Sequence, residues 1–309
     1  MLEILYTIYY LWNKGPQVQT DGINRRYTIV YIHGAGHCGS TLLNLLLNAH
    51  SNVIGLSEIS TLHKAFMDNK FGSESAELSK TKFWRSILNE FEQRSGTSLL
   101  EESNRFRLLD WQQYFSLDPD EVSHIQKVDR TFFDSIAEQI DTSIICDASK
   151  FLVRLHMLVS SGLPAKVVHL DRDGRGVTHS YLRKGHSFKN AFRRWSIGAT
   201  GYILLSHWLP KNDLHYCRYE DLARHPEKEL EKICAFLGIN FENEMLVDFR
   251  NTENFGICGN RMRNSKDTNI LVDNSWKQQL PLKTKIKFWL SGGWIQWPIR
   301  LWAAIRERS

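Results

Sequence analysis

Cysteine is scarce in this chain of 309 residues, which contains only 5 cysteines. They are scattered, odd in number and include no Cys-x-x-Cys pair, which argues against a disulfide framework and against a cysteine-ligated metal cluster. The pattern therefore predicts a reducing compartment and a cytoplasmic location, and no metal is expected. The five are Cys38, Cys146, Cys217, Cys234 and Cys258.

The chain also has no long basic tract, no aromatic RNA-binding motif and no zinc-ligand spacing. Its net charge of +5 is mild, so it suits an anionic ligand but gives no reason to predict a nucleic-acid partner. The apolar residues 2–12 are too few for a membrane-spanning helix, include Glu3 and lack the basic start of a signal peptide. We interpret them as a segment that docks on the rest of the protein.

The most informative stretch is residues 27–50, YTIVYIHGAGHCGSTLLNLLLNAH. Residues 27–32 are apolar and β-branched, which predicts a buried strand, and the leucines of residues 42–47 predict the apolar face of a helix. Strand, glycine loop and helix together present backbone N–H groups and a helix N-terminus to an anion. The candidate contacts to a phosphate or sulfate are Gly36, His37, Cys38, Gly39, Ser40 and Thr41.

Three interpretations of this loop remain open from the loop alone. It fits Gly-x-x-x-x-Gly-x-Thr, but the P-loop of ATPases and GTPases needs a lysine where Ser40 stands. Residues 34–39 also fit Gly-x-Gly-x-x-Gly, the dinucleotide-binding pattern, in which an acidic residue follows about 20 residues on. Glu58 lies near that distance. Finally, residues 37–41 resemble the 5′-phosphosulfate loop of sulfotransferases, which runs basic-Ser-Gly-Thr-Thr.

Beyond residue 140 the sequence alternates between short apolar strands and helices. Strands are predicted at residues 143–146, 166–170 and 214–217, with helices between them. This alternation predicts an α/β fold, with a P-loop-like and mostly parallel sheet flanked by helices. We expect one domain over residues 1–309, with a helical insert over about residues 60–140 that shapes an acceptor site.

Polar side chains follow each predicted strand at once. The carboxyl ends of parallel strands meet at one edge of a sheet, which is where ligands bind in such folds. We therefore expect these side chains to face the same ligand. They are Glu58, Asp147, Lys150, Arg172 and Tyr219.

The segment from Val168 to Ser180 resembles the 3′-phosphate motif of sulfotransferases. In that motif a strand is followed by Arg-Asp-Pro-Arg, and a serine follows at a fixed distance from the first arginine. Arg172 and Ser180 keep this distance, and Gly174 replaces the proline. The arginine offers a planar fork of N–H donors to a phosphate, and the serine on the following helix completes the site.

Further segments resemble the same family in the same order. Residues 147–150 are similar to an Asp-Ser-Ser-Lys variant of bacterial-type members, and residues 218–222 to a Tyr-Glu-Asp-Leu segment. Residues 258–263, followed by Trp276, resemble the C-terminal loop that covers the nucleotide. The resemblance implies a sulfotransferase that uses 3′-phosphoadenosine 5′-phosphosulfate (PAPS) without a metal and releases the desulfated product PAP. Beyond the loop, the nucleotide-binding residues that it implies are Arg172, Ser180, Tyr219, Arg261 and Arg263.

The run that ends at Glu58 is also similar to tyrosylprotein sulfotransferases. There a glutamate at the place of Glu58 is the catalytic base, and a lysine near the place of Lys150 assists. Elementary chemistry agrees, because transfer to a hydroxyl needs a base at the nucleophile and cations on the migrating group. His37, a third catalytic candidate, stands where the family has lysine or arginine. Either its imidazole is charged beside the anion, or Arg261 and Arg263 supply the missing charge.

We predict transfer of the sulfuryl group of PAPS to a hydroxyl on a carbohydrate, a lipid or a small metabolite. Two alternatives remain. A kinase-like nucleotide phosphotransferase would bind ATP and Mg²⁺. A nucleotide-binding regulatory module without catalysis would bind PAP without depending on Glu58 or Lys150.

The C-terminal tail, residues 283–309, mixes tryptophans with basic residues. This composition is typical of a segment that lies on an anionic membrane, which would give peripheral membrane contact and favour a lipid-linked acceptor. Residues 291–293, Ser-Gly-Gly, and Pro298 interrupt the tail and argue against one long spanning helix. The alternative is a terminal helix whose tryptophans pack on the domain.

Overall fold

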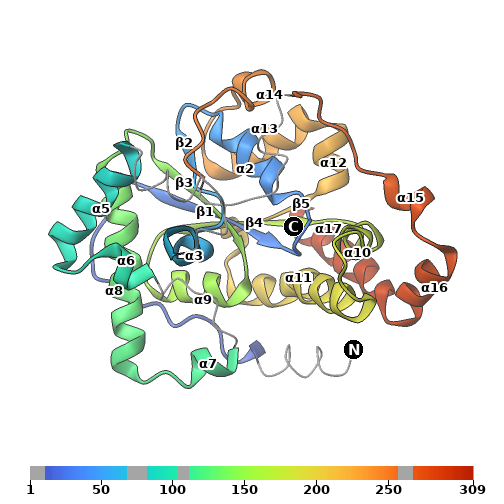
Figure 1. Cartoon of the computed structure of the whole chain (residues 1–309), viewed down its shortest axis with the longest axis horizontal. Coiled ribbons are helices and arrows are strands. Elements are labelled where there is room, and N and C mark those ends of the chain that lie inside the picture. Colours follow the sequence, from blue (N-terminus) through green and yellow to red (C-terminus); the bar gives the residue numbers. More distant parts are fainter. Residues whose placement is uncertain (1–10, 68–81, 104–110, 257–266, 309) are drawn as a thin grey trace.

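Five parallel strands form the central sheet of the computed structural model, which describes residues 11–67, 82–103, 111–256 and 267–308. The strand order is β2-β3-β1-β4-β5, so the first strand lies in the middle (Figure 1). The strands are β1 (Thr28–Gly34), β2 (Val53–Gly55), β3 (Ile144–Lys150), β4 (Ala165–Asp171) and β5 (Leu214–Arg218).

Strand β1 is buried on both faces. Val30 and Ile32 pack into one apolar cluster, whereas Ile29 and Tyr31 pack into clusters on the opposite face. A parallel strand covered on both sides needs apolar residues at every position, which explains the continuous apolar run in the sequence.

Helices cover both faces of the sheet, as Figure 1 shows. The predicted α/β class with a parallel sheet flanked by helices is therefore confirmed. One face carries α2 (Ser40–Asn48), α12 (Tyr219–Arg224), α13 (Pro226–Leu237) and α14 (Glu244–Val247). The other carries α8 (Pro119–Glu138), α9 (Leu152–Ser160), α11 (Phe188–Trp208) and α17 (Gln296–Arg308).

The segment between β2 and β3 is helical in its described parts, as predicted. Helix α5 turns Trp84, Ile87 and Phe91 inward at spacings of three and four residues, and they share an apolar cluster with Phe132 and Phe133 of α8. The elements of the insert are the 3₁₀ turn η1 (Ile59–Thr61), α3 (Leu62–Met67), α5 (Lys82–Ser95), α6 (Leu99–Glu102), α7 (Trp111–Phe115) and α8.

Strand β3 is longer than predicted. The sequence placed Asp147 and Lys150 after the strand, but β3 continues to Lys150, and His33 of β1 is paired with that residue. The register shifts between Tyr31 and His33, so the last residues of β3 follow an irregular path. The Asp-Ala-Ser-Lys motif is therefore part of the sheet and does not form a loop beyond it.

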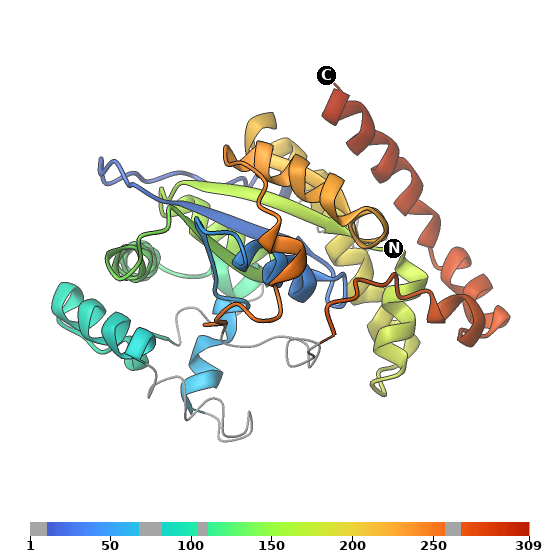
Figure 2. The ribbon, with the colours of Figure 1, turned by 90° about the horizontal axis from the view of Figure 1, so that it is seen from above.

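The C-terminal tail forms two helices joined by a short 3₁₀ turn along one side of the molecule. Gly292, with a φ of 108°, separates its two helices, as the Ser-Gly-Gly interruption predicted. Figure 2 shows α16 (Leu282–Leu290) and α17 at the edge of the molecule on that side. Across the described residues, no helix is both long and apolar enough to cross a membrane. The tail consists of α16, the 3₁₀ turn η6 (Gly293–Ile295) and α17, and the short helix α15 (Ser275–Gln279) precedes it.

Candidate functional site

The glycine loop joins β1 to α2 at the carboxyl edge of the sheet. Gly39, the residue before α2, has a φ of 105°, and a Cβ there would lie 2.5 Å from the ring of Tyr219. A Cβ on Gly36 would clash with the hydroxyl of Tyr181. Both positions therefore require glycine, and two tyrosine rings pack directly on the loop.

The side chains of the loop do not all face outward. Cys38 and Ser40 are buried, whereas His37 and Thr41 are half-buried. An anion would therefore contact the loop mainly through the backbone N–H groups on either side of Cys38, whose own N–H donates to the carbonyl oxygen of Ala35 at 3.2 Å. This fits a loop that binds through its backbone and the N-terminus of α2.

Positive charge gathers around His37. Burial is the main reason why the pKa of its imidazole falls to about 4, and the charges of Lys184, Arg172 and Lys150 add to the effect. The imidazole is therefore neutral near pH 7 in this structure, so the hypothesis of a charged His37 is not supported for the protein without its anion. Cations from three separate elements surround the loop, as an anion site requires.

Glu58 and Lys150 meet at this edge from neighbouring strands. The Nζ atom of Lys150 lies 2.6 Å from Oε1 of Glu58 and also donates to the carbonyl oxygen of Ala148 at 3.1 Å. The Glu58 side chain is 25% exposed and that of Lys150 is 8% exposed. The carboxylate of Glu58 is therefore accessible to a substrate, and the buried ammonium of Lys150 holds it in place.

The backbone that places this pair is strained. Ser57 has a φ of 59° and Lys150 a φ of 73°, both in the left-handed region that residues with a Cβ rarely adopt. The N–H of Ala148 donates to the carbonyl oxygen of Ser57 at 2.7 Å, which fixes the two segments together. Strain of this kind concentrates at functional sites.

Arg172, at the end of β4, binds the glycine loop directly. Its guanidinium donates to the carbonyl oxygen of His37 at 2.9 Å and to the carboxylate of Asp273 at 2.9 Å. It also lies over the ring of Tyr219, 4.4 Å from the centroid. The hydroxyl of Tyr219 accepts a hydrogen bond from the N–H of Asp273 at 3.1 Å. The two predicted motifs, far apart in the sequence, thus form one structure.

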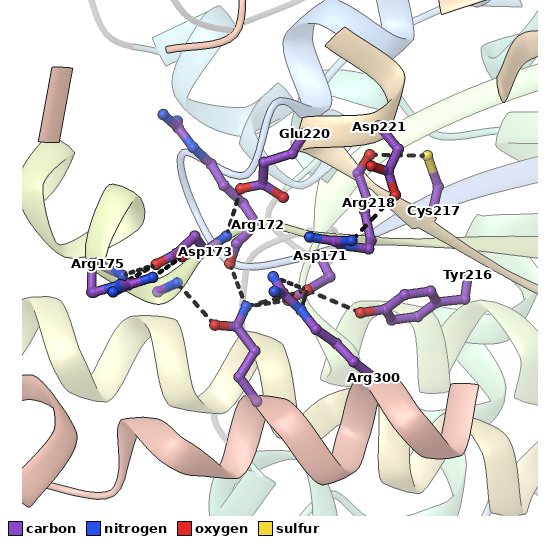
Figure 3. A network of polar contacts seen from close by, with 12 residues as sticks. Asp171, Arg172, Asp173, Arg175, Tyr216, Cys217, Arg218, Glu220, Asp221 and Arg300 are labelled. Atoms are coloured by element: carbon purple, nitrogen blue, oxygen red, sulfur yellow. Dashed lines mark hydrogen bonds and ion pairs between the residues drawn. The ribbon is translucent and has the colours of Figure 1, made fainter. Parts of the chain in front are cut away.

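Helix α17 holds Asp171 and the backbone of Arg172 at the end of β4. Arg300 and the hydroxyl of Tyr216 point at the carboxylate of Asp171 and donate to it at 2.8 and 2.9 Å, as Figure 3 shows. The amide of Gln296 donates to the same carboxylate at 3.0 Å and to the carbonyl oxygen of Arg172 at 2.9 Å. The C-terminal tail therefore holds the carboxylate of Asp171 and the backbone of Arg172.

A pair of buried histidines lies beneath the loop. Nδ1 of His33 and Nδ1 of His169 are 2.9 Å apart, and burial lowers the pKa of both rings, that of His169 to about 3. Burial also raises the pKa of Asp147 to about 6, although Ser149 donates to its carboxylate. These groups take part in packing below the site.

The structure thus brings most of the predicted site residues to one edge. Glu58 pairs with Lys150, and Arg172 and Tyr219 contact the glycine loop. Ser180 lies half-buried on α10 (Gly174–Leu182), the helix that follows Arg172. The predicted nucleotide contacts Arg261 and Arg263 lie outside the described residues.

Three residues of the site were missed by the sequence analysis: Asp273, Gln296 and Arg300. Asp273 stands between the loop of residues 258–263 and Trp276, but no local pattern marks it as the ion-pair partner of Arg172. Gln296 and Arg300 lie in the tail. Its mixture of tryptophans and basic residues does not indicate which polar side chains turn inward to contact the Arg172 loop.

The profile of the sulfotransferase family matches residues 30–243, which is more than half of the chain. No curated protein matches. The fold is similar to that of the sulfotransferase domain from the Synechococcus PCC 7002 olefin synthase, with a TM-score of 0.57 at 20% identity, covering 87% of this chain and 96% of that one. It is also similar to the sulfotransferase domain from the curacin biosynthetic pathway, with a TM-score of 0.50 at 21% identity, covering 86% and 97%.

Proposed function

This chain belongs to the sulfotransferase family, and from that premise we propose that it is a single-domain enzyme that transfers the sulfuryl group of PAPS to a hydroxyl acceptor. The observation that carries the donor assignment is the 2.9 Å hydrogen bond from Arg172 to the carbonyl oxygen of His37. It joins the proposed 3′-phosphate motif to the proposed 5′-phosphosulfate loop, as a nucleotide with phosphates at both positions requires.

The residues at the loop suit such a donor. Backbone N–H groups of residues 36–41 and the N-terminus of α2 would hold the 5′-phosphosulfate, and Arg172 with Ser180 would hold the 3′-phosphate. Gly36 and Gly39 have no side chains, which lets the rings of Tyr181 and Tyr219 pack directly against the backbone of the loop. Lys184, Arg172 and Lys150 supply positive potential at the loop, which adds to the effect of burial in lowering the pKa of His37.

Glu58 and Lys150 would carry the chemistry. The bound donor supplies a sulfuryl group on a good leaving group. The carboxylate of Glu58 would accept the proton of the acceptor hydroxyl, which makes its oxygen a better nucleophile. Lys150 orients that carboxylate through the 2.6 Å ion pair and would place its positive charge next to the leaving oxygen.

The acceptor is the less specific part of the proposal. We assign it to the hydroxyls of carbohydrates, lipids or small metabolites, bound against the helical insert between β2 and β3. Four buried cysteines among the described residues form no disulfide bond, which suits a cytoplasmic enzyme. The tail would add peripheral contact with a membrane.

A thermal-shift screen with PAP, PAPS, ATP with Mg²⁺, and NAD tests the proposal. A ligand that binds only the folded state raises the free energy of unfolding by RT ln(1 + [L]/Kd), so the best ligand gives the largest shift. We expect PAP and PAPS to raise the melting temperature in a concentration-dependent way. Stabilisation by ATP with Mg²⁺ but not by PAP would instead identify a kinase-like enzyme.

A further inference from the structure

Helices α16 and α17 and the turn between them carry several exposed apolar side chains, which we name the tail surface. All of them are more than half exposed, from 55% for Trp294 to 84% for Leu290. Soluble proteins rarely expose large apolar patches without a partner. The residues of the tail surface are Leu290, Trp294, Trp297, Leu301, Trp302 and Ile305.

These side chains are not needed to hold the tail on the protein. The inward face of α17 is made by Gln296, Ile299, Arg300 and Ala303, at spacings of three and four residues. Two of these four are polar and make hydrogen bonds to the Arg172 loop. The helix therefore turns polar anchors inward and tryptophan and leucine outward, which contradicts the expectation that all the tryptophans pack on the domain.

The charged side chains of α16 and α17 are basic except for one. Lys283 and Lys287 of α16 and Arg308 of α17 are exposed. The one acidic side chain of the two helices, Glu307, accepts a hydrogen bond from the N–H of Tyr216 at 3.0 Å and faces the His215 ring. The basic side chains at the surface are therefore not neutralised by Glu307, and their charge is complementary to an anionic partner.

These observations favour a membrane over a second copy of the chain. In a symmetric dimer the same patch meets itself, so the lysines of one copy would face the lysines of the other, which is unfavourable. Tryptophan beside lysine and arginine is the composition of helices that lie in the headgroup region of anionic bilayers. We propose that the tail surface docks this protein on membranes that contain anionic phospholipid.

The position of the tail surface deepens the proposed function and in this respect rests on it. Gln296 and Arg300 of α17 bind the loop that holds Arg172, while Leu301 and Trp302 of the same helix face outward. Docking would thus hold the carboxyl edge of the sheet close to the bilayer. This would suit an acceptor whose hydroxyl is part of a lipid or is linked to one.

Co-sedimentation with vesicles tests the proposal without any nucleotide, so it is independent of the proposed sulfuryl transfer. The variant Leu301→Gln/Trp302→Gln removes two apolar side chains and keeps good helix formers. Val247→Gln/Leu271→Gln removes two other exposed apolar side chains, 52% and 76% exposed, and is the matched control. We expect the wild type and the control to sediment with phosphatidylcholine vesicles containing 30% phosphatidylserine, and the tail variant to bind at least tenfold more weakly.

Two further measurements test the role of charge and the folding of the tail variant. Binding to pure phosphatidylcholine should be several-fold weaker, and Lys283→Gln/Lys287→Gln should remove most of that difference. Circular dichroism and the melting temperature check that the tail variant is folded, because deletion of the tail would also remove the buried Phe288 and Ile299. Equal sedimentation of the wild type and the tail variant overturns the proposal. A dimer in light scattering that the tail variant converts to monomer assigns the surface to a second copy and also overturns it.

Discussion

The ammonium of Lys150 lies 2.6 Å from the carboxylate of Glu58, although 92 residues separate them in the chain. One residue follows β2 and the other ends β3, and each is next to or at a residue with positive φ. An ion pair at the carboxyl edge of a parallel sheet, built on strained backbone, is the arrangement from which the proposed chemistry follows.

Glu58→Gln should lower kcat by about 10²–10⁴ and leave the affinity for PAP near that of the wild type, because the amide keeps the shape of the side chain but cannot accept a proton. Steady-state kinetics with an acceptor and calorimetry with PAP measure the two quantities. Glu138→Gln, a change of an exposed carboxylate on α8, is the control. Normal turnover in the Glu58 variant would exclude this residue as the base and favour a module that only binds nucleotide.

Asp273→Asn should tighten PAP binding by about two- to fivefold. The Asp273 carboxylate, 39% exposed, forms an ion pair with Arg172 at 2.9 Å and so competes with a phosphate for the same guanidinium; exposed ion pairs contribute up to about 1 kcal/mol. Asparagine can still accept the hydrogen bond that the N–H of Ser275 makes to this side chain. Asp120→Asn on α8 should not change the affinity. Weaker binding in the Asp273 variant would mean that this carboxylate supports the nucleotide site.

Gln296→Ala should raise KM for PAPS about tenfold with a smaller effect on kcat. The amide is 6% exposed and bonds to both Asp171 and the backbone of Arg172, so its loss frees the loop that holds Arg172. The unpaired acceptors left behind should also lower the free energy of unfolding by about 1–3 kcal/mol. Gln278→Ala, an exposed position of α15, provides the comparison. A variant that loses stability but keeps its KM would have a structural role only.

The stability of the protein should fall as the pH decreases from 6.5 towards 4. The pKa values of His33, His169 and His37 are lowered in the folded protein, so the unfolded chain binds more protons in this range, and each buried histidine costs up to about 1.4 kcal/mol per pH unit. The raised pKa of Asp147 acts in the opposite direction below pH 6. His169→Gln should make the dependence shallower, whereas His225→Gln at an exposed position should not. Chemical denaturation at several pH values measures the free energy of unfolding across this range. Equal slopes of this free energy against pH in all three proteins would show that the buried histidines do not control the pH dependence.

The sequence identified the features that local pattern determines. The apolar run of β1, the small residues of the glycine loop and the distance from Arg172 to Ser180 are all local, and the strands, the fold class and the family followed from them. The sequence did not predict that β3 extends to Lys150, because Asp147, Ser149 and Lys150 are residue types that are common in loops. Pairing with β1, which no local pattern encodes, holds them in the sheet.

Contacts between distant segments could not be predicted. Nothing in the tail sequence distinguishes Gln296, which reaches the Arg172 loop, from the exposed Gln278. The composition of the tail is compatible with tryptophans that pack on the domain and with tryptophans that face a membrane. Only the burial of each side chain in the structure distinguishes these two alternatives. Phe288 is buried, whereas Trp297 and Trp302 face outward.

Arg172 is the residue assigned to the 3′-phosphate, and calorimetric titration with PAP and with 5′-AMP tests this assignment most directly. The wild type and an Arg183→Ala control should bind PAP more tightly than 5′-AMP by about tenfold or more, since hydrogen bonds to a charged group contribute about 1.5–3 kcal/mol. Arg172→Ala should bind the two nucleotides almost equally. An Arg172→Ala protein that keeps the full preference for PAP, or a wild type that shows none, would contradict the account.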